Sequence, residues 1–331
     1  MTRQVAPAGR LSADQVKAVL RTAILAPSTH NTQPWLFGSG PEGIRLYADA
    51  DRALPTADAD RREMLLSCGA ALFNLRTAIH TLGVYPATTL FPRRDEPDLL
   101  ALVRPMAATR IDHRVAALAR AIPRRHTNRT PFHATAVPPS AVGRLRHAAE
   151  IEHTWLPRLD AAQLAALLEL VHESHQAQLN EPAFLAEWRR WTGRGPGSRD
   201  GVPRLAGGTA PEPGDEWVLR VSGSGTGSGN PVSPAAPLVV VIGSFGDGPI
   251  DRLRAGQAMQ RVLLTATAEG LDASFISQPV EVPQARGRLR DLLGGGLWPQ
   301  IGLRLGHGSP VSRTPRRSLA DVMVDSGRLT A

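Results

Sequence analysis

"CGAALFNLRTAIHTLGV" occupies residues 68–84, and "AGQAMQRVLLTATAEGL" occupies residues 255–271. At an offset of 187 residues, Gly69 aligns with Gly256 and Gly83 aligns with Gly270. The first stretch continues an apolar pattern that begins near residue 61, and a glycine at its end is typical of a helix C-terminus. We therefore predict two similar long helices, one in each half of the chain.

A second pair of segments preserves the order of the first. "LSADQVKAVLRTA" (11–23) aligns with "VPPSAVGRLRHAA" (137–149) at an offset of 126 residues. Two matches in the same order indicate a duplicated unit, with about 61 extra residues in the second copy. We predict a first half at 1–121 and a second half at 122–331, with an inserted lid or loop segment at about 170–237.

The remaining periodicity predicts alternating helices and strands. Residues 193–237 are rich in glycine, serine and proline and indicate a loop, lid or linker. Outside them, alternation of this kind predicts an α/β or α+β fold. The predicted helices are 12–26, 61–82, 139–149, 160–178, one from Asn180, 251–269 and 283–293; the predicted strands are 35–37, 44–48, 101–106, 238–243, 274–277 and 300–305.

Composition limits the classes of function. The chain has 331 residues, of which 42% are hydrophobic, so most of it should fold. It has no apolar run long enough for a membrane span and no apolar segment typical of a signal peptide. Cys68 is the single cysteine, which excludes internal disulfides and cysteine-clustered metal sites and fits the reducing cytoplasm. The net charge of +8 comes from arginines interspersed with acidic residues, so we expect no nucleic-acid partner.

Two polar segments stand out, and each half has only one of them. "APSTHNTQPW" (26–35) follows the first helix of the first half, whereas "RRHTNRTPF" (124–132) precedes the first helix of the second half. In an extended segment, alternate residues such as Arg125, Thr127 and Arg129 share a face that suits a phosphate. The segments could instead be a helix-stop loop and a solvated basic loop. If the halves pack as a pseudo-dimer, the two segments could face each other across one site.

These segments resemble the flavin-dependent nitroreductases, and most closely the Acg-type branch, in which two nitroreductase-like halves are fused. The resemblance extends over most of the chain through "CGAALFNLRTAIHTLG", "RDGVPR" (199–204), "GLDASFISQPVE" (270–281), "PQIGLRLGHGSP" (299–310) and "TPRR" (314–317). It implies an α+β fold, with a mainly antiparallel sheet flanked by helices in each half and FMN between the halves.

The resemblance also implies a set of cofactor-binding residues. Arg125 would hold the FMN phosphate, His126 and Thr127 the phosphate–ribityl part or the ring edge, and Arg129 the N1/O2 edge. From the polar loop, the cofactor would be contacted by Pro27, Ser28, Thr29, Asn31 and Gln33. Along the flavin face, the contacts would come from Ser274, Phe275, Ile276, Ser277 and Gln278. At the phosphate, they would come from Arg316 and Arg317.

One departure from the family pattern concerns the strand beside flavin N5. Typical nitroreductases carry a proline and a glutamate there, whereas this chain has Phe275, Ile276 and Ser277. This strand therefore lacks the carboxylate that would contact a substrate. We assign no catalytic side chain and no metal ligand, because the cofactor carries the chemistry.

Three functions remain open on the sequence. The first is an FMN-dependent oxidoreductase that transfers a hydride from NAD(P)H through flavin N5 to a nitroaromatic, a quinone or a similar acceptor. The second is a non-catalytic FMN-binding or sequestering protein whose lid blocks the donor, and the third is a specialised biosynthetic flavoenzyme. We expect a cytoplasmic monomer built as a pseudo-dimer, or a weak homodimer. Within the lid, we expect order near 199–204 and mobility near 222–230.

Overall fold

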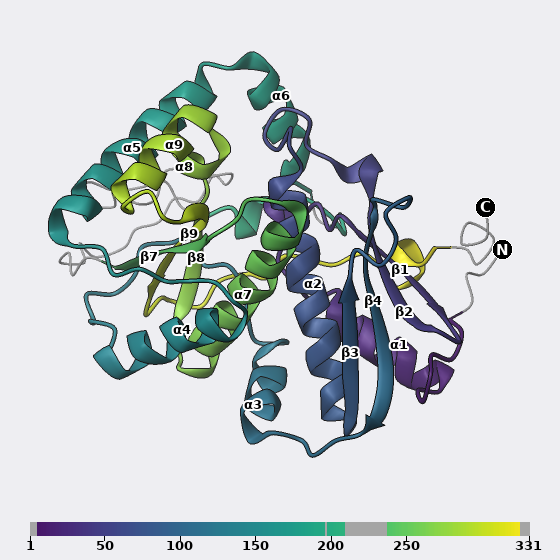
Figure 1. The fold of residues 1–331 in the computed structure, drawn as a ribbon. Coiled ribbons are helices and arrows are strands. Elements are labelled where there is room, and N and C mark those ends of the chain that lie inside the picture. Colours follow the sequence, from purple (N-terminus) through teal and green to yellow (C-terminus); the bar gives the residue numbers. More distant parts are fainter. Residues whose placement is uncertain (1–4, 196, 209–236, 325–331) are drawn as a thin grey trace.

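The computed structural model describes residues 5–195, 197–208 and 237–324 (Figure 1). The segment 222–230, for which we predicted mobility, and residues 209–236 of the predicted lid lie outside these residues. The helices are α1 (Ala13–Ala23), α2 (Arg62–Thr81), α3 (His113–Ala121), α4 (Pro139–Ile151), α5 (Ala161–Leu179), α6 (Pro182–Trp191), α7 (Pro249–Ala268), α8 (Gln278–Glu281) and α9 (Pro283–Leu292). The strands are β1 (Trp35–Gly40), β2 (Gly43–Ala48), β3 (Val84–Leu90), β4 (Leu99–Ala108), β5 (Thr192–Arg194), β6 (Val202–Pro203), β7 (Leu238–Ser244), β8 (Asp272–Ile276) and β9 (Trp298–Gly306).

Two antiparallel sheets flank the central helix pair α2 and α7 (Figure 1). The first sheet has the order β1-β2-β4-β3, and the second has the order β7-β9-β8. In each sheet, an interior strand (β4 or β9) is the one that comes last in the sequence of its half. Its two neighbours in the sheet are the strands just before and just after the long helix: β2 and β3 around α2, and β7 and β8 around α7. The α+β class predicted from the sequence is confirmed. The shared strand order is the one expected of a duplicated unit, and the division at residues 121 and 122 stays a prediction.

The two aligned glycines allow α2 and α7 to pack with their backbones in contact. A Cβ atom added to Gly69 would lie 2.9 Å from the Cα of Gly256 and would collide with the carbonyl oxygen of Leu253. A Cβ atom on Gly256 would lie 2.7 Å from the carbonyl carbon of Leu66. Any larger residue at either position would force the helices apart. The offset that aligns the two sequence segments therefore pairs the same two glycines that lie against each other where α2 and α7 pack.

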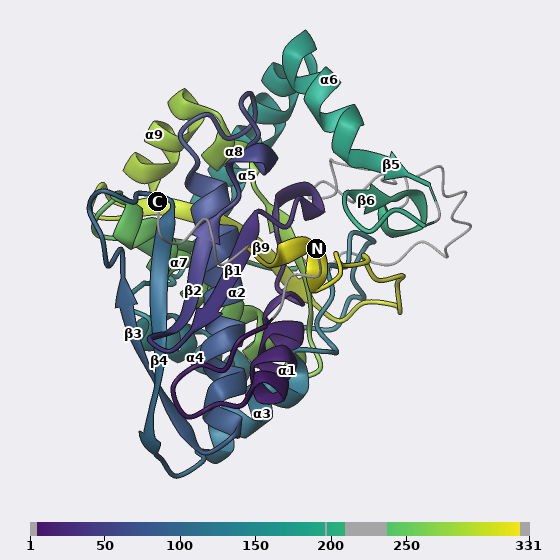
Figure 2. The ribbon, with the colours of Figure 1, turned by 90° about the vertical axis from the view of Figure 1, so that its right-hand side faces the viewer.

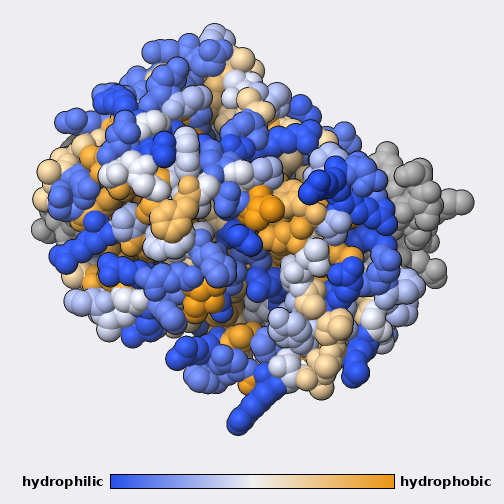
Figure 3. Space-filling view, in the orientation of Figure 1, coloured by the Kyte–Doolittle hydropathy of each residue, from blue (hydrophilic) through white to orange (hydrophobic). Residues whose placement is uncertain are grey.

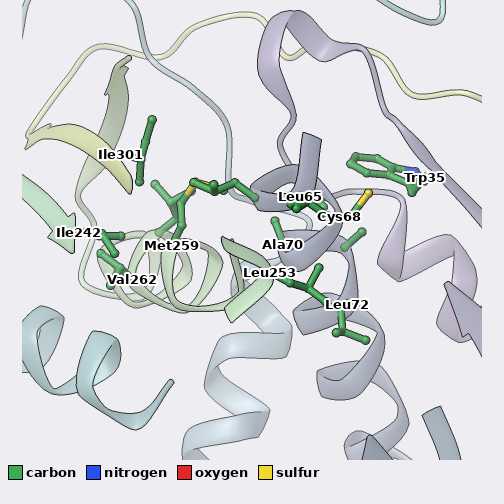
Figure 4. Close-up of a cluster of buried hydrophobic side chains, with 14 of the residues drawn as sticks. Trp35, Leu65, Cys68, Ala70, Leu72, Ile242, Leu253, Met259, Val262 and Ile301 are labelled. Carbon is green, nitrogen blue, oxygen red and sulfur yellow. The ribbon is translucent and has the colours of Figure 1, made fainter. Parts of the chain in front are cut away.

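One apolar core extends across both sheets and both central helices. Figure 4 shows side chains from α2 and α7 interleaved, with Trp35 on the side of the first sheet and Ile242 and Ile301 on the side of the second. Trp35 and Ile242 are completely buried. Hydrophilic residues cover most of the face seen in Figure 3, interrupted by small groups of hydrophobic ones. The two halves thus share one interior.

Local sequence explains how several helices begin. Ser12 and Gln15 form the predicted capping box at the start of α1. At the start of α2, the buried carboxylate of Asp58 accepts the backbone N–H groups of Glu63 and Met64, each at 2.8 Å. These bonds satisfy donors that the first turn of a helix leaves without partners.

The sequence prediction lacked the short elements β5, β6 and α8 and two longer ones, β3 and α3. The edge strand β3 contains Pro86, and its exposed or half-exposed side chains show no alternation of polar and apolar residues. An edge strand tolerates proline because one of its sides makes no ladder hydrogen bonds. The short helix α3 begins at the capping carboxylate of Asp112, which accepts the N–H of Arg114 at 2.8 Å.

The segment after α4 departs from the layout of the first half. Trp155 forms an isolated antiparallel bridge with Gly243 of β7. This bridge takes the place beside β7 that β1 takes beside β2 in the first half. The chain then forms α5 and α6 before it reaches β5 and β6. Helix α6 lies at the end of the molecule opposite α3 (Figures 1 and 2).

Within residues 5–195, 197–208 and 237–324, no helix combines the length and the apolar character that crossing a bilayer requires. The same residues contain no group of three or more His, Cys, Asp or Glu side chains placed to hold a metal ion.

Candidate functional site

The polar loop after α1 is held in an unusual backbone conformation. His30, Asn31 and Gln33 have positive φ values of 48°, 56° and 52°, which side-chain-bearing residues seldom adopt. The hydroxyl of Ser28 accepts the N–H of Gln33 at 2.9 Å and so closes the loop. Backbone of this kind persists where surrounding contacts hold it, often at a binding site.

This loop forms one wall of a cavity between the two halves. The cavity encloses about 1170 Å³ of empty space, including its open mouth. The loop, the segment before α4, helices α2 and α7, the edge of the second sheet and the C-terminal segment all contribute to its wall. The residues that line it are Pro27, Ser28, Thr29, His30, Asn31, Glu63, Leu66, Ser67, Arg125, Thr127, Arg129, Trp188, Thr192, Val202, Met259, Ser274, Phe275, Ser277, Gln278, Ile301, Arg304, Thr314 and Arg316.

Arg125 is buried in this wall without a counter-ion among the described residues. Arg125 is only 7% exposed, and its Nε and Nη1 atoms have no hydrogen-bond partner within the described ranges. Burial, together with the nearby charges of Arg316, Arg129 and Arg313, lowers the pKa of Arg125 to about 9. A buried cation with unused donors and cationic neighbours favours an anionic ligand.

Two further arginines extend the cationic wall. Burial lowers the pKa of Arg129 to about 10, and it lowers the pKa of Arg316 to about 10 as well. Arg129 donates to the carbonyl of Ala206 at 2.8 Å, and Arg316 donates to the side-chain oxygen of Asn31 at 3.0 Å. The Nε of Arg316 has no partner in the part of the chain that the structure describes. These bonds fix the guanidinium groups while leaving donors for a ligand.

Asn31 joins three segments that are distant in the sequence. Its side-chain nitrogen donates to the carbonyls of Gly201 at 2.9 Å and Pro315 at 3.1 Å. Its backbone carbonyl accepts the N–H of Gly201 at 3.2 Å. The polar loop, the 199–204 segment and the C-terminal segment therefore meet at one buried residue.

The structure brings most of the predicted site residues to this one cavity. Four of the sixteen lie outside its wall. Ile276 is buried in the apolar core, and His126 contacts the carboxylate of Asp272 at 3.3 Å. The side chain of Gln33 bonds to the carbonyl of Arg199 and to the N–H of Arg317, each at 2.8 Å. These four positions support the wall from behind.

Arg317 lines a second, charged hollow together with Asp49, Arg52 and Asp200. It pairs with Asp49 at 3.2 Å, while Arg52 pairs with Asp200 at 2.9 Å and donates to the carbonyl of Thr32 at 2.7 Å. Asp200 belongs to the segment 199–204, for which we predicted order. These bonds hold that segment against the polar loop.

The sequence analysis did not identify one acidic residue of the cavity. Glu63, in the first turn of α2, is 3% exposed and accepts a hydrogen bond from the hydroxyl of Thr29 at 2.8 Å. Desolvation by burial and the charge of Glu281 raise the pKa of Glu63 to about 8, against the lowering effects of Arg62 and Thr29. A glutamate in the first turn of a helix is ordinary, so nothing in the local sequence signalled its burial.

The segment from α6 to β6 contributes a further part of the wall. The sequence analysis predicted this segment only as part of an insertion. Trp188, Thr192 and Val202 line the cavity from α6, β5 and β6. Trp188 also packs against a small apolar cluster that includes Phe184 and Leu54. The described part of the predicted insertion therefore covers one side of the cavity.

Comparison with known proteins identifies relatives over nearly the full length. The chain is 34% identical over 324 residues to a protein of Mycobacterium tuberculosis named "Putative NAD(P)H nitroreductase Rv3131", covering 94% of this chain and 91% of that protein. It is 28% identical over 334 residues to "Putative NAD(P)H nitroreductase acg" of the same organism, covering 96% and 97% of the two chains. It is also 29% identical over 332 residues to the uncharacterised mycobacterial protein Rv3127, covering 92% of each.

Two solved structures give partial matches. A nitroreductase with bound FMN from Bacteroides fragilis aligns with a TM-score of 0.38 and 14% identity, covering 65% of this chain and 97% of that one. The NADPH:FMN oxidoreductase of Vibrio harveyi aligns with a TM-score of 0.35 and 12% identity, covering 61% and 73%. No protein-family model matches the chain. The full-length identity of 34% to the mycobacterial relative shows that the chain belongs to the NAD(P)H nitroreductase family.

Proposed function

We propose that the protein is an FMN-dependent oxidoreductase that uses NAD(P)H to reduce a quinone, a nitroaromatic compound or a similar planar acceptor. The observation that carries this proposal is the buried Arg125, whose Nε and Nη1 lack partners among the described residues, beside Arg316, whose Nε lacks one as well. A flavin mononucleotide carries a phosphate that would satisfy these donors. The names of the mycobacterial relatives support the same reaction class.

The cavity residues suit the different parts of FMN. Arg125 and Arg316 would hold the phosphate, and Arg129 would place a positive charge near the ring. Ser274 and Phe275 from β8 would lie along the flavin, next to the hydroxyl groups of the polar loop. When bound, FMN supplies two-electron redox chemistry between NAD(P)H and the acceptor. The chain's own residues bind and orient the cofactor and shield it from water.

The lining of the cavity is typical of a cofactor site. Such sites combine apolar walls with a few placed polar groups. Here apolar side chains such as Leu66, Met259 and Ile301 line the cavity together with the arginines. The two polar segments are each present in only one half, so we propose a single FMN per chain.

A second candidate function is an FMN-binding protein that does not turn over. Trp188, Thr192 and Val202 cover one side of the cavity, and Asp200 ties their segment to Arg52. If this cover excludes nicotinamide, the bound flavin would be sequestered. The order of the 199–204 segment favours this possibility enough to require a direct test.

The test is anaerobic mixing of the FMN-loaded protein with NADPH, after the ratio of flavin to protein has been measured by absorbance. The oxidoreductase predicts a ratio of one and rapid bleaching of the ~450 nm flavin band. The sequestering protein predicts the same ratio, with bleaching by dithionite only. A ratio of two would contradict the single-site proposal, and failure to bind FMN would contradict both functions.

A further inference from the structure

Glu63 is not among the residues that we assign to FMN, yet it lines the same cavity. It is the only carboxyl group on the cavity wall among the described residues, where every other ionisable side chain apart from His30 is an arginine. Its Oε2 accepts from the hydroxyl of Thr29 at 2.8 Å, and Thr29 lines the cavity as well. The carboxyl and this hydroxyl are therefore adjacent on the wall.

Different charged groups act on Glu63 and on Arg125 of the proposed phosphate site. The charged groups that act on Glu63 are Glu281 of α8, Arg62 of α2 and Asp58 before α2. The groups that act on Arg125 are instead Arg316, Arg129 and Arg313. Arg316, Arg129 and Arg313 thus act on Arg125, whereas the arginine whose charge acts on Glu63 is Arg62.

The surroundings of Glu63 favour the protonated carboxyl. Arg62 donates to Oε1 at 3.1 Å, and its charge lowers the pKa of Glu63 less than burial and the charge of Glu281 raise it. The pKa of Glu63, raised to about 8, leaves most of the carboxyl protonated at neutral pH. A protonated carboxyl can donate a proton, as a catalytic acid must at the pH at which it works.

The proposed reaction needs such a donor. Reducing a quinone to a hydroquinone adds two electrons and two protons. NAD(P)H supplies two electrons and one proton as a hydride equivalent, so one further proton must come from an acid. Reduction of a nitro group to a nitroso group and water has the same requirement for one extra proton.

We propose that Glu63 is the catalytic acid that delivers this proton to the acceptor oxygen in the cavity. This inference rests on the proposed function. In the step, the O–H bond of the Glu63 carboxyl breaks and an O–H bond forms on the acceptor oxygen. The resulting carboxylate takes a proton from solvent before the next turnover, and Thr29 hydrogen-bonds to it meanwhile. The carboxyl missing from the strand beside Phe275 is thereby supplied from α2.

The first test compares two acceptors in wild-type protein and in Glu63→Gln, both loaded with FMN. Ferricyanide takes electrons without a proton, whereas benzoquinone requires one. Glutamine keeps the size of the side chain and can still accept from Thr29. We expect the ratio of the benzoquinone rate to the ferricyanide rate to fall roughly 100-fold, the usual scale of general acid catalysis. A ratio within about threefold of wild type would overturn the proposal.

The second test follows pH, which a merely structural role would not affect. The wild-type ratio should decline as pH rises through about 8, and the Glu63→Gln ratio should be flat. Glu281→Gln removes a charge that raises the pKa of Glu63, so its decline should move to lower pH. A decline that does not move in Glu281→Gln would assign the titration to another group and overturn the proposal.

A third measurement does not depend on turnover. Infrared spectroscopy of the protein at pH 7 should show a protonated-carboxyl band that is missing from Glu63→Gln, and its absence from wild type would count against the acid. A holoprotein that reduces neither acceptor would refute the proposed function, and with it this inference. A holoprotein that reduces both acceptors without dependence on Glu63 would refute only the role of Glu63.

Discussion

Replacing Arg125 by methionine should make the empty protein more stable and at the same time weaken FMN binding. Methionine retains a long, flexible side chain that can fill the same space without the charge. The folded pKa of Arg125 lies below that of an exposed arginine, so at neutral pH its charge destabilises the folded state. Its removal should relieve this cost, while the cofactor loses a charged donor.

The magnitudes follow from the structure. A pKa lowered to about 9 corresponds to a cost on the order of 5 kcal/mol for the charged form, at about 1.4 kcal/mol per pKa unit. Replacement of buried charges by apolar side chains typically recovers about 1–4 kcal/mol, so we expect about 1–3 kcal/mol of added stability. Loss of a charge-assisted hydrogen bond should cost about 1.5–3 kcal/mol of FMN affinity, or roughly 10–150-fold in Kd.

The assay is urea denaturation of FMN-free protein, followed by fluorescence titration with FMN. Arg120→Met is the matched control, because Arg120 is exposed on α3 and should change stability by no more than about 0.5 kcal/mol. At saturating FMN the difference in stability should shrink or reverse, because ligand binding stabilises the wild type more. An Arg125→Met variant that is less stable without FMN would refute the unpaired-cation reasoning. Equal losses of affinity in both variants would mean that the basic cluster acts only as diffuse charge.

Three further outcomes are expected. Gly69→Ala should destabilise the protein by about 1–3 kcal/mol, because its Cβ meets the backbone of α7, whereas Gly143→Ala, with open space around it, should stabilise α4 by about 0.5–1 kcal/mol in urea denaturation. Asp200→Asn weakens the ion pairs with two arginines, so amide hydrogen exchange at 199–203 should speed up while exchange in the central helices stays the same. Thr29→Val removes a hydrogen bond that lowers the pKa of Glu63, so the decline of quinone reduction with pH should move upward, and a downward move would contradict the assigned contact.

The sequence alone was sufficient for the features that depend on local pattern. The long helices and most strands follow from the spacing of apolar residues within short stretches of sequence. The Ser12 capping box follows from two residues three positions apart. The aligned glycines Gly69 and Gly256 also indicated a relation between α2 and α7. The polar loop and the arginine-rich segment stood out as candidate binding segments because each concentrates polar or cationic side chains in a few residues.

The tertiary structure decided which of those side chains share a cavity. Ile276 and Ser277 are neighbours in the sequence, yet one is in the core and the other lines the cavity, because successive residues at the end of β8 face different surroundings. Gln33 bonds to Arg317, which is 284 positions away, and so supports the wall without lining it. A pattern within one segment of the sequence cannot predict such a pairing.

Glu63 shows the same limit for chemistry. In the sequence it is one acidic residue in the first turn of a helix, where a carboxylate normally faces solvent and stabilises the helix N-terminus. Folding removes its water and brings the charge of Glu281 near it, and these two effects raise its pKa. Secondary structure depends on neighbours within a turn or a strand, whereas burial and electrostatic environment depend on segments that only the folded chain brings together.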